Sequence, residues 1–329
     1  MADISKRPLL GRRLVFVTGK GGVGKTTVAA ALAELAAKAG QRTLICEMDD
    51  KGAVADAFDA APLGFQPRLL QPNLYAMAMN TEDSLREYLR LFVRIPLLGT
   101  LAPLAKTFDF VADAAPGVKE ILAVGKLAHE VRERHYDFVV VDAEASGHIV
   151  AQIGAPSAIR ELVNVGMVRE QTDWMIDLLG DPDVTGVVVV TTPEEMPVTE
   201  SIELLERLRS DVRVDVAAVV ANRVLADRLD ADQEASLDRL ADDTAREALV
   251  ALVGPEIDTV ILAARLAQSR ADLGAGHLTR LRAALPADTP MFRVPELFAR
   301  ATGRRVVAKV AEALATQVNA IDAVDEVDR

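Results

Sequence analysis

The sequence predicts an α/β fold: a doubly wound, mostly parallel sheet with a helical insertion. Short apolar runs rich in β-branched residues recur along the chain, and most precede a helical pattern. They lie at residues 14–18, 42–47, 74–79, 138–142, 186–192, 214–220 and 290–296. Continuous apolar runs are typical of parallel strands covered by helices on both faces. Between residues 60 and 134 the alternation lapses and helical patterns predominate. We therefore expect one domain over residues 1–329, with a helical insertion at 60–134.

The first apolar run leads into a glycine-rich loop and a helix. Residues 19–26 read G-K-G-G-V-G-K-T, which matches the phosphate-binding pattern G-x-x-x-x-G-K-[ST] in the strand–loop–helix context that it requires. Glycines let loop amides approach phosphate oxygens, and the helix N-terminus adds a positive dipole. Lys25 is expected to reach the β- and γ-phosphates, and the Thr26 hydroxyl to bind Mg²⁺. The sheet is therefore of the P-loop NTPase type. The predicted nucleotide-binding residues here are Gly21, Gly22, Val23, Gly24, Lys25, Thr26 and Thr27.

A second nucleotide motif is predicted at the end of the run F-V-V-V-D, residues 138–142. Such a run suits a central strand, and the carboxyl ends of parallel strands meet at one edge of the sheet. Asp142 should therefore lie beside the phosphate-binding loop and hold Mg²⁺ or its water.

The composition excludes several classes of protein. Half of the 329 residues are hydrophobic, and the net charge is −12, which argues against nucleic acid or an anionic membrane as the main partner. The single cysteine, Cys46, cannot form an internal disulfide or a four-cysteine metal site. No signal-peptide pattern and no run of 18 apolar residues is present. We expect a cytoplasmic protein without stable membrane insertion.

The loop K-G-G-V-G-K-T-T resembles the deviant phosphate-binding loop of the group that includes ArsA, MinD, ParA and the nitrogenase iron protein. In that group the first lysine crosses a dimer interface and touches the partner's nucleotide, so the resemblance implies this role for Lys20. The single cysteine disfavours the nitrogenase-iron-protein branch. The acidic C-terminus, A-V-D-E-V-D-R, is unlike the basic helix of a MinD-type membrane tether.

Two further segments resemble the nucleotide-sensing switches of the ArsA family. Counting back from the D-A-F at residues 56–58 places the family's water-activating aspartate at Asp49, which implies a catalytic and Mg²⁺-contacting role. Residues 50–52 read D-K-G where P-A-H is usual, so Asp50 is the alternative. Residues 142–148, D-A-E-A-S-G-H, are similar to the switch II sequence D-T-A-P-T-G-H. Gly147 would then turn its amide towards the γ-phosphate, while the unexpected Glu144 could help or slow hydrolysis.

The resemblance also implies a base-binding region. The family places the asparagine of an N-R or N-K pair against the adenine edge, which corresponds to Asn222 and Arg223. The segment around Pro295 resembles the loop that closes over the base. The guanine-specific pattern N-K-x-D is absent here, which favours ATP. The helical residues 225–285, including His277, give no indication of a metal site.

Together these motifs resemble a single-domain member of the ArsA family of guided-entry ATPases. The resemblance implies a cofactor pair of ATP and Mg²⁺, a homodimer or a heterodimer with a paralogous ArsA-like ATPase, and an ATPase switch that handles a protein or hydrophobic client. A long helix at 156–179 would couple switch II to the insertion. The alternative is a weakly hydrolysing regulatory or assembly module for a paralogous partner, which the altered switch II favours. A ParA-like positioning ATPase on DNA is disfavoured by the acidic charge.

Overall fold

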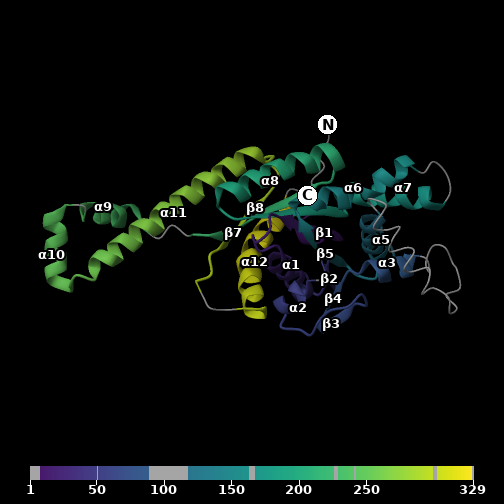
Figure 1. Cartoon of the computed structure of the whole chain (residues 1–329), viewed down its shortest axis with the longest axis horizontal. Coiled ribbons are helices and arrows are strands. Elements are labelled where there is room, and N and C mark those ends of the chain that lie inside the picture. Colours follow the sequence, from purple (N-terminus) through teal and green to yellow (C-terminus); the bar gives the residue numbers. More distant parts are fainter. Residues whose placement is uncertain are drawn as a thin grey trace.

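The computed structural model describes residues 8–49, 51–88, 118–162, 167–225, 229–240, 242–298 and 302–327. Its centre is an eight-stranded sheet in the order β3-β4-β2-β5-β1-β6-β7-β8, in which only β3 runs antiparallel to its neighbour (Figure 1). The strands are β1 (Leu14–Gly19), β2 (Thr43–Glu47), β3 (Arg68–Gln71), β4 (Leu74–Ala78), β5 (Phe138–Ala145), β6 (Thr185–Thr191), β7 (Val216–Val224) and β8 (Met291–Pro295). The predicted mostly parallel α/β sheet is confirmed.

Helices cover both faces of this sheet and create two hydrophobic cores. One core joins the sheet to α1 (Lys25–Lys38), α2 (Ala53–Ala57) and α12 (Arg304–Val327). The other joins it to α5 (Val118–Arg132), α6 (Ser146–Leu162), α7 (Met167–Gly180), α8 (Glu195–Arg207) and the inner end of α11 (Ile257–Ala284). Strands β1, β2 and β6 are buried along their whole length, as expected for strands covered on both faces.

The predicted helix at 156–179 was wrong. Instead of one helix there are two, α6 and α7, and Pro156 lies inside α6. The apolar residues Ile149 and Ile153 are buried against the sheet, and this packing outweighs the preference of proline for a first helical turn. In α8, by contrast, Pro197 lies in the first turn, where N–H groups lack helical partners in any case.

The region 60–134 contributes strands as well as helices. Both β3 and β4 belong to the main sheet, although only one strand was expected, and α3 (Thr81–Tyr88) packs on α5. The α3 N-terminus is capped by Asn80, whose Oδ1 accepts the N–H of Asp83 at 3.1 Å. Residues 89–117, the middle part of the predicted insertion, lie outside the described residues. The division into domain and insertion therefore stays a prediction.

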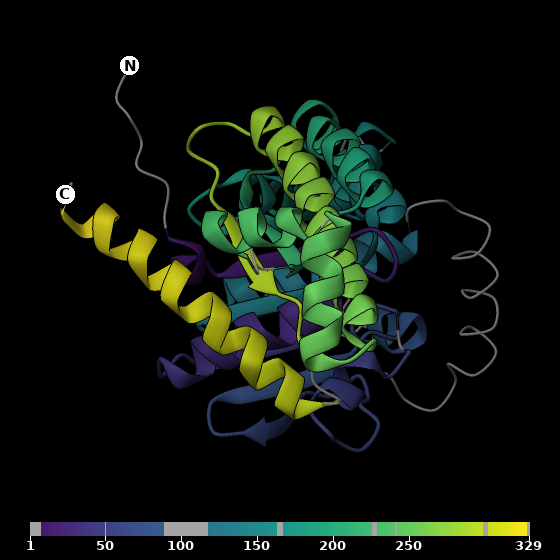
Figure 2. The same ribbon diagram turned by 90° about the vertical axis from the view of Figure 1, so that its left-hand side faces the viewer.

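Between β7 and β8 the chain forms a helical projection. Helices α9 (Ala231–Arg239) and α10 (Asp243–Val253) lead into the long α11, and together they extend away from the sheet (Figures 1 and 2). We call α9, α10 and residues 257–270 of α11 the arm. In the part of the chain that the structure describes, every helix is too short or too polar to cross a membrane.

Candidate nucleotide-binding site

The predicted phosphate-binding loop lies between β1 and α1, which begins at Lys25. Two of its glycines are fixed by close approach. A Cβ on Gly19 would lie 2.1 Å from the Val190 carbonyl oxygen, and one on Gly24 would lie 2.3 Å from Asn222 Nδ2; both residues have positive φ. Around Gly21 and Gly22 the space that a Cβ would take is open. The loop is thus held tightly at both ends and open in the middle, which suits close approach of a phosphate.

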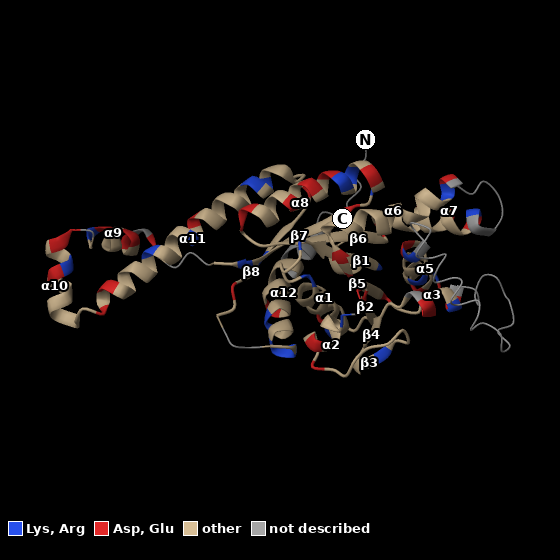
Figure 3. Ribbon diagram, in the orientation of Figure 1, with Lys and Arg blue, Asp and Glu red and all other residues tan. Residues whose placement is uncertain are grey.

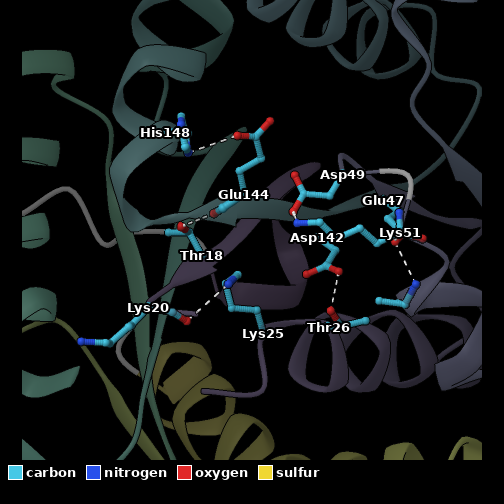
Figure 4. Close-up of polar contacts among 11 residues, drawn as sticks. Thr18, Lys20, Lys25, Thr26, Glu47, Asp49, Lys51, Asp142, Glu144 and His148 are labelled. Carbon is cyan, nitrogen blue, oxygen red and sulfur yellow. Dashed lines mark hydrogen bonds and ion pairs between the residues drawn. The ribbon is translucent and has the colours of Figure 1, made fainter. Parts of the chain in front are cut away.

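Thr26 and Asp142 meet at the carboxyl edge of the sheet (Figure 4). The Thr26 hydroxyl donates to Asp142 Oδ2 at 2.6 Å, while the buried Oδ1 has no hydrogen-bond partner among the described residues. Burial raises the pKa of Asp142 to about 6, despite the opposing effects of the Thr26 hydrogen bond and the Lys25 charge. A buried carboxylate oxygen without a partner beside a hydroxyl fits a Mg²⁺ ion or its water.

The two loop lysines have different environments. Lys25 Nζ lies 3.3 Å from the carbonyl oxygen of Lys20, and desolvation by burial lowers the pKa of Lys25 although Asp142 and Asp49 oppose this. Lys20 instead extends to α8, where its Nζ forms an ion pair with Glu200 Oε1 at 2.5 Å. In this single chain, therefore, Lys20 contacts an acidic side chain of its own subunit.

Asp49 follows β2 and is paired with Lys51, whose Nζ donates to Asp49 Oδ2 at 2.6 Å. This ion pair raises the pKa of Lys51. Both Asp49 and Asp142 act electrostatically on Lys25, so the predicted water-activating residue does lie near the predicted phosphate-binding lysine. The alternative, Asp50, lies outside the described residues.

Glu47 lies beside the site but was not predicted from the sequence. Its carboxylate, 1% exposed, accepts three backbone N–H groups: Oε1 from Lys51 at 3.1 Å and Ala53 at 2.8 Å, and Oε2 from Val54 at 3.3 Å. The start of α2 has Gly52 as its N-cap, which carries no side chain to cap the helix. Glu47 supplies that cap and holds the turn that carries Asp49. A strand-ending glutamate before an uncapped short helix was the available signal.

Switch II forms the junction between β5 and α6. Residues Ala143 to Ala145 continue the strand, and Gly147 and His148 lie in the first helical turn, where backbone N–H groups are free of helical partners. Glu144 makes two contacts that hold it in place. Its carbonyl oxygen accepts a hydrogen bond from the Thr18 hydroxyl at 3.0 Å, and its Oε2 lies 3.3 Å from His148 Nδ1. Gly147 is exposed with open space around it, so its amide is accessible from this edge of the sheet.

The predicted base-binding residues divide into two groups. Asn222 is buried and braces the loop: its Nδ2 donates to the Val23 carbonyl at 2.8 Å, and its Oδ1 accepts the N–H of Arg223 at 3.0 Å. Arg223 and Pro295 instead line a cavity of about 820 Å³ at the ends of β6, β7 and β8. Helix α11 contributes a wall of this cavity that the sequence did not predict, including Arg270, Gly274 and His277.

A metal ion at this edge would need ligands from outside the protein. The described residues contain no group of three or more His, Cys, Asp or Glu side chains placed to hold a metal. Thr26 and Asp142 together offer two oxygen ligands. Mg²⁺ commonly binds through one or two protein oxygens together with water and phosphate oxygens. The donor set would therefore fit a Mg²⁺ ion whose other ligands are water and phosphate oxygens.

Comparison with known proteins is consistent with this geometry. Residues 12–175 and 156–246 match the anion-transporting ATPase family. The chain is 32% identical to the ATPase BagA of Mycobacterium tuberculosis over 226 residues, which are 65% of this chain and 66% of BagA. It is 26% identical to an ATPase ASNA1 homolog of Babesia bovis, over 64% of this chain and 66% of that protein. It is 24% identical to an ATPase ASNA1 homolog of Entamoeba dispar, over 64% and 76%. The chain thus matches just under two thirds of the length of BagA, and it belongs to the anion-transporting ATPase family.

Proposed function

We propose that this protein binds ATP with Mg²⁺ and hydrolyses it as part of a dimeric molecular switch in the cytoplasm. The observation that carries the proposal is the Thr26–Asp142 pair, whose buried Oδ1 has no hydrogen-bond partner within the described part of the chain. The pair lies at the end of a loop in which Gly19 and Gly24 are required by close contacts. Membership of the ATPase family supports the reaction type.

Each proposed role follows from the charge that develops during phosphoryl transfer. The loop amides and Lys25 bind the phosphates, and Lys25 neutralises charge on the transferred group. Thr26 and Asp142 would hold Mg²⁺ with Asp49 nearby, and the ion would supply further charge neutralisation. Asp49 would orient the attacking water, and the Gly147 amide would bind a γ-phosphate oxygen. Lys20 leaves Glu200 and contacts the nucleotide of a second subunit. Arg223 and Pro295 enclose the base beside Asn222.

The purpose of the switch is proposed from the family. Loss of the γ-phosphate would release the segments that carry Asp49 and Gly147 and thereby open a homodimer, or a heterodimer with a paralogous ATPase. The dimer would handle a protein or hydrophobic client. The second candidate is a regulatory module that binds nucleotide but hydrolyses it poorly. The pairing of Lys20 with Glu200 and of Asp49 with Lys51 favours it, because both proposed catalytic side chains are held by charges of their own subunit.

Turnover and binding measurements distinguish these candidates. We expect purified protein to hydrolyse ATP at least tenfold faster than Lys25→Ala, and calorimetry to detect Mg²⁺–ATP binding that Lys25→Ala weakens. Asp49→Asn should retain binding but lose turnover. Binding without turnover above the Lys25→Ala background would support the regulatory module. Absence of binding would refute both candidates. Glu206→Gln, an exposed charge change on α8, serves as the control.

A further inference from the structure

The N-terminus of α12 is capped by a residue of a different element. Gly303 precedes the first turn, where its carbonyl oxygen accepts the N–H of Val306 at 3.0 Å, and a glycine has no side chain with which to cap a helix. The carboxylate of Asp59, just after α2, takes this role: its Oδ2 accepts the N–H of Arg304 at 3.1 Å. A Cβ on Gly303 would overlap that carboxylate. The contact therefore requires glycine at position 303.

The charge of the first turn of α12 makes an anionic cap favourable. This turn has no acidic residue and begins with two arginines, Arg304 and Arg305, although the positive end of the helix dipole lies there. Figure 3 shows basic residues in blue at the start of α12, close to acidic residues in red around α2. A carboxylate from outside the helix offsets both the dipole and the arginines.

The backbone of Asp59 has a conformation that usually belongs to glycine. At the end of α2 the N–H of Ala60 bonds to the Ala55 carbonyl at 2.9 Å. The N–H of Asp59 bonds to the Asp56 carbonyl at 3.2 Å, and its φ is 52°, as expected for the left-handed residue that closes a helix in this way. Glycine adopts this conformation at lower cost than aspartate. The side chain at position 59 is therefore explained by its contact with α12 and not by the turn itself.

Further along, α12 is bonded to the edge strand of the sheet. β8 is the last strand in the order and pairs with β7, so in the described part of the chain its outer backbone groups face no other strand. The Gln317 side chain bonds both groups of Arg293: its Oε1 accepts the N–H at 2.9 Å, and its Nε2 donates to the carbonyl oxygen at 2.8 Å. Arg293 lines the cavity proposed to hold the base. Helix α12 thus fixes the backbone of one cavity wall.

These contacts place α12 between two parts of the proposed site (Figure 1). At its start it meets α2, whose own start is held by Glu47 to the turn that carries Asp49. About 20 Å further along the helix, at 1.5 Å per residue, it holds the cavity wall. Between these points α12 is packed in the core that also contains α1, so it moves as a rigid unit. The buried residues that pack it there are Val307, Val310, Ala311, Leu314 and Val318.

We propose that Asp59 and Gln317 are positioning residues through which a base in the cavity steadies the turn that carries Asp49. A base held against the wall at Arg293 fixes β8 on α12, and Asp59 passes this restraint to α2. The turn is then well ordered only around a ligand that has a base as well as phosphates. The site thereby distinguishes nucleotides from inorganic polyphosphates. This inference rests on the proposed function, which supplies the positions of the base and the phosphates.

Hydrogen exchange of the full chain, read by mass spectrometry, tests the inference with two probes. Mg²⁺–ADP carries a base, whereas Mg²⁺–pyrophosphate offers phosphates without one. In the wild type we expect saturating ADP to slow exchange of the α2 amides, residues 53–57, about fivefold more than saturating pyrophosphate. This difference should vanish in Asp59→Gly, which keeps the left-handed turn but removes the carboxylate, and in Gln317→Ala. The double variant should show no further change, because both side chains act in one path.

Matched variants control for a general loosening of the fold. Asp56→Asn changes an exposed carboxylate on α2, and Glu312→Gln changes an exposed carboxylate on α12. Both should keep the additional protection by ADP. Asp59→Asn should keep it as well, because asparagine accepts the same N–H and tolerates the left-handed conformation.

Three results would overturn the inference: equal protection of α2 by both probes in the wild type, additional protection that persists in Asp59→Gly and Gln317→Ala, or its loss in the control variants too. Calorimetry with both probes separates this from failure of the proposed function. A wild type that binds ADP without additional protection of α2 refutes the inference alone. A wild type that binds neither probe refutes the proposed function and the inference with it.

Discussion

At the scale of single residues, the central feature of the site is the buried carboxyl group of Asp142, whose Oδ1 has no hydrogen-bond partner among the described residues. Asp142 has a pKa raised to about 6 because burial disfavours its ionised form. A raised pKa in the folded state means that the folded protein holds this proton more tightly than the unfolded chain. The stability that the proton provides is present below about pH 4 and is lost as the pH rises through 6.

We therefore expect Asp142→Asn to stabilise the nucleotide-free protein. At pH 8 the free energy of unfolding should rise by about 1–2 kcal/mol, because a buried charge is removed and part of the gain is offset by the altered bond to Thr26. At pH 4 the difference should largely disappear, and stabilisation by Mg²⁺–ATP should be lost at both values. Urea unfolding of both proteins measures this. An equal difference at pH 4 and pH 8 would contradict the account.

At the scale of elements, Glu47 links β2 to the turn that carries Asp49 and to the start of α2. Both of its oxygens are occupied by backbone donors, so its role is to position the turn and not to bind a metal or activate water. A charged acceptor at a helix start is worth about 1 kcal/mol in stability.

We expect Glu47→Gln to lower the ATP turnover number by about tenfold while nucleotide affinity changes by less than threefold. The amide accepts hydrogen bonds through one atom only, so the turn loosens and Asp49 loses its position. In an Asp49→Asn background, which alone should cost about 100-fold, Glu47→Gln should have no further effect on turnover. Fully additive effects of the two substitutions in single-turnover assays would show that Glu47 does not act through Asp49.

At the scale of the whole molecule, a buried ion pair that stabilises the fold and the residues proposed to bind nucleotide lie at opposite ends of the strands. Arg12, which precedes β1, is 2% exposed and contacts the amino ends of β6 and β7. Its Nη1 donates to the Thr185 carbonyl at 2.9 Å, and its Nη2 pairs with Asp215 at 2.7 Å. The residues proposed to bind nucleotide lie at the opposite, carboxyl ends of strands that include β1, β2, β5 and β7.

Arg12→Met should therefore lower the free energy of unfolding by about 3 kcal/mol, because it breaks a buried ion pair from one side. Well below the unfolding temperature, the dissociation constant for Mg²⁺–ATP should remain within twofold of the wild type. Thermal unfolding and calorimetry at 15 °C measure the two quantities. A large loss of affinity without loss of stability would show that the two edges are coupled.

Local signals were enough to predict the loop between β1 and α1, the strand that carries Asp142 and the doubly wound sheet, because each depends on residues a few positions apart. The strand with Asp142 continues to Ala145, three residues beyond its predicted end. The partners of Lys20 and Glu47 were not predictable in this way. Glu200 lies 180 positions from Lys20, and Glu47 is defined by backbone N–H groups whose positions exist only once the turn has formed.

The projection of the arm away from the sheet could not be predicted from the sequence for a different reason. Leu262, Leu266 and Leu273 have the same period whether a helix packs on its own domain or projects into solvent, so the sequence of 225–285 predicted helices without indicating where they go. Only the structure shows that the apolar face of this stretch is left uncovered.

The continuity of α11 has a mechanical consequence. A single unbroken helix of 28 residues runs from the wall of the cavity to the arm, and from His277 to Ile257 it spans roughly 30 Å at about 1.5 Å per residue. Gly274 packs closely against Pro193, where an added Cβ would be 3.1 Å from the proline ring. This contact is a point about which α11 could pivot. A tilt of about 5° there, as a ligand fills or leaves the cavity, would displace the far end by roughly 2 Å, which is enough to change the fit of any surface it touches.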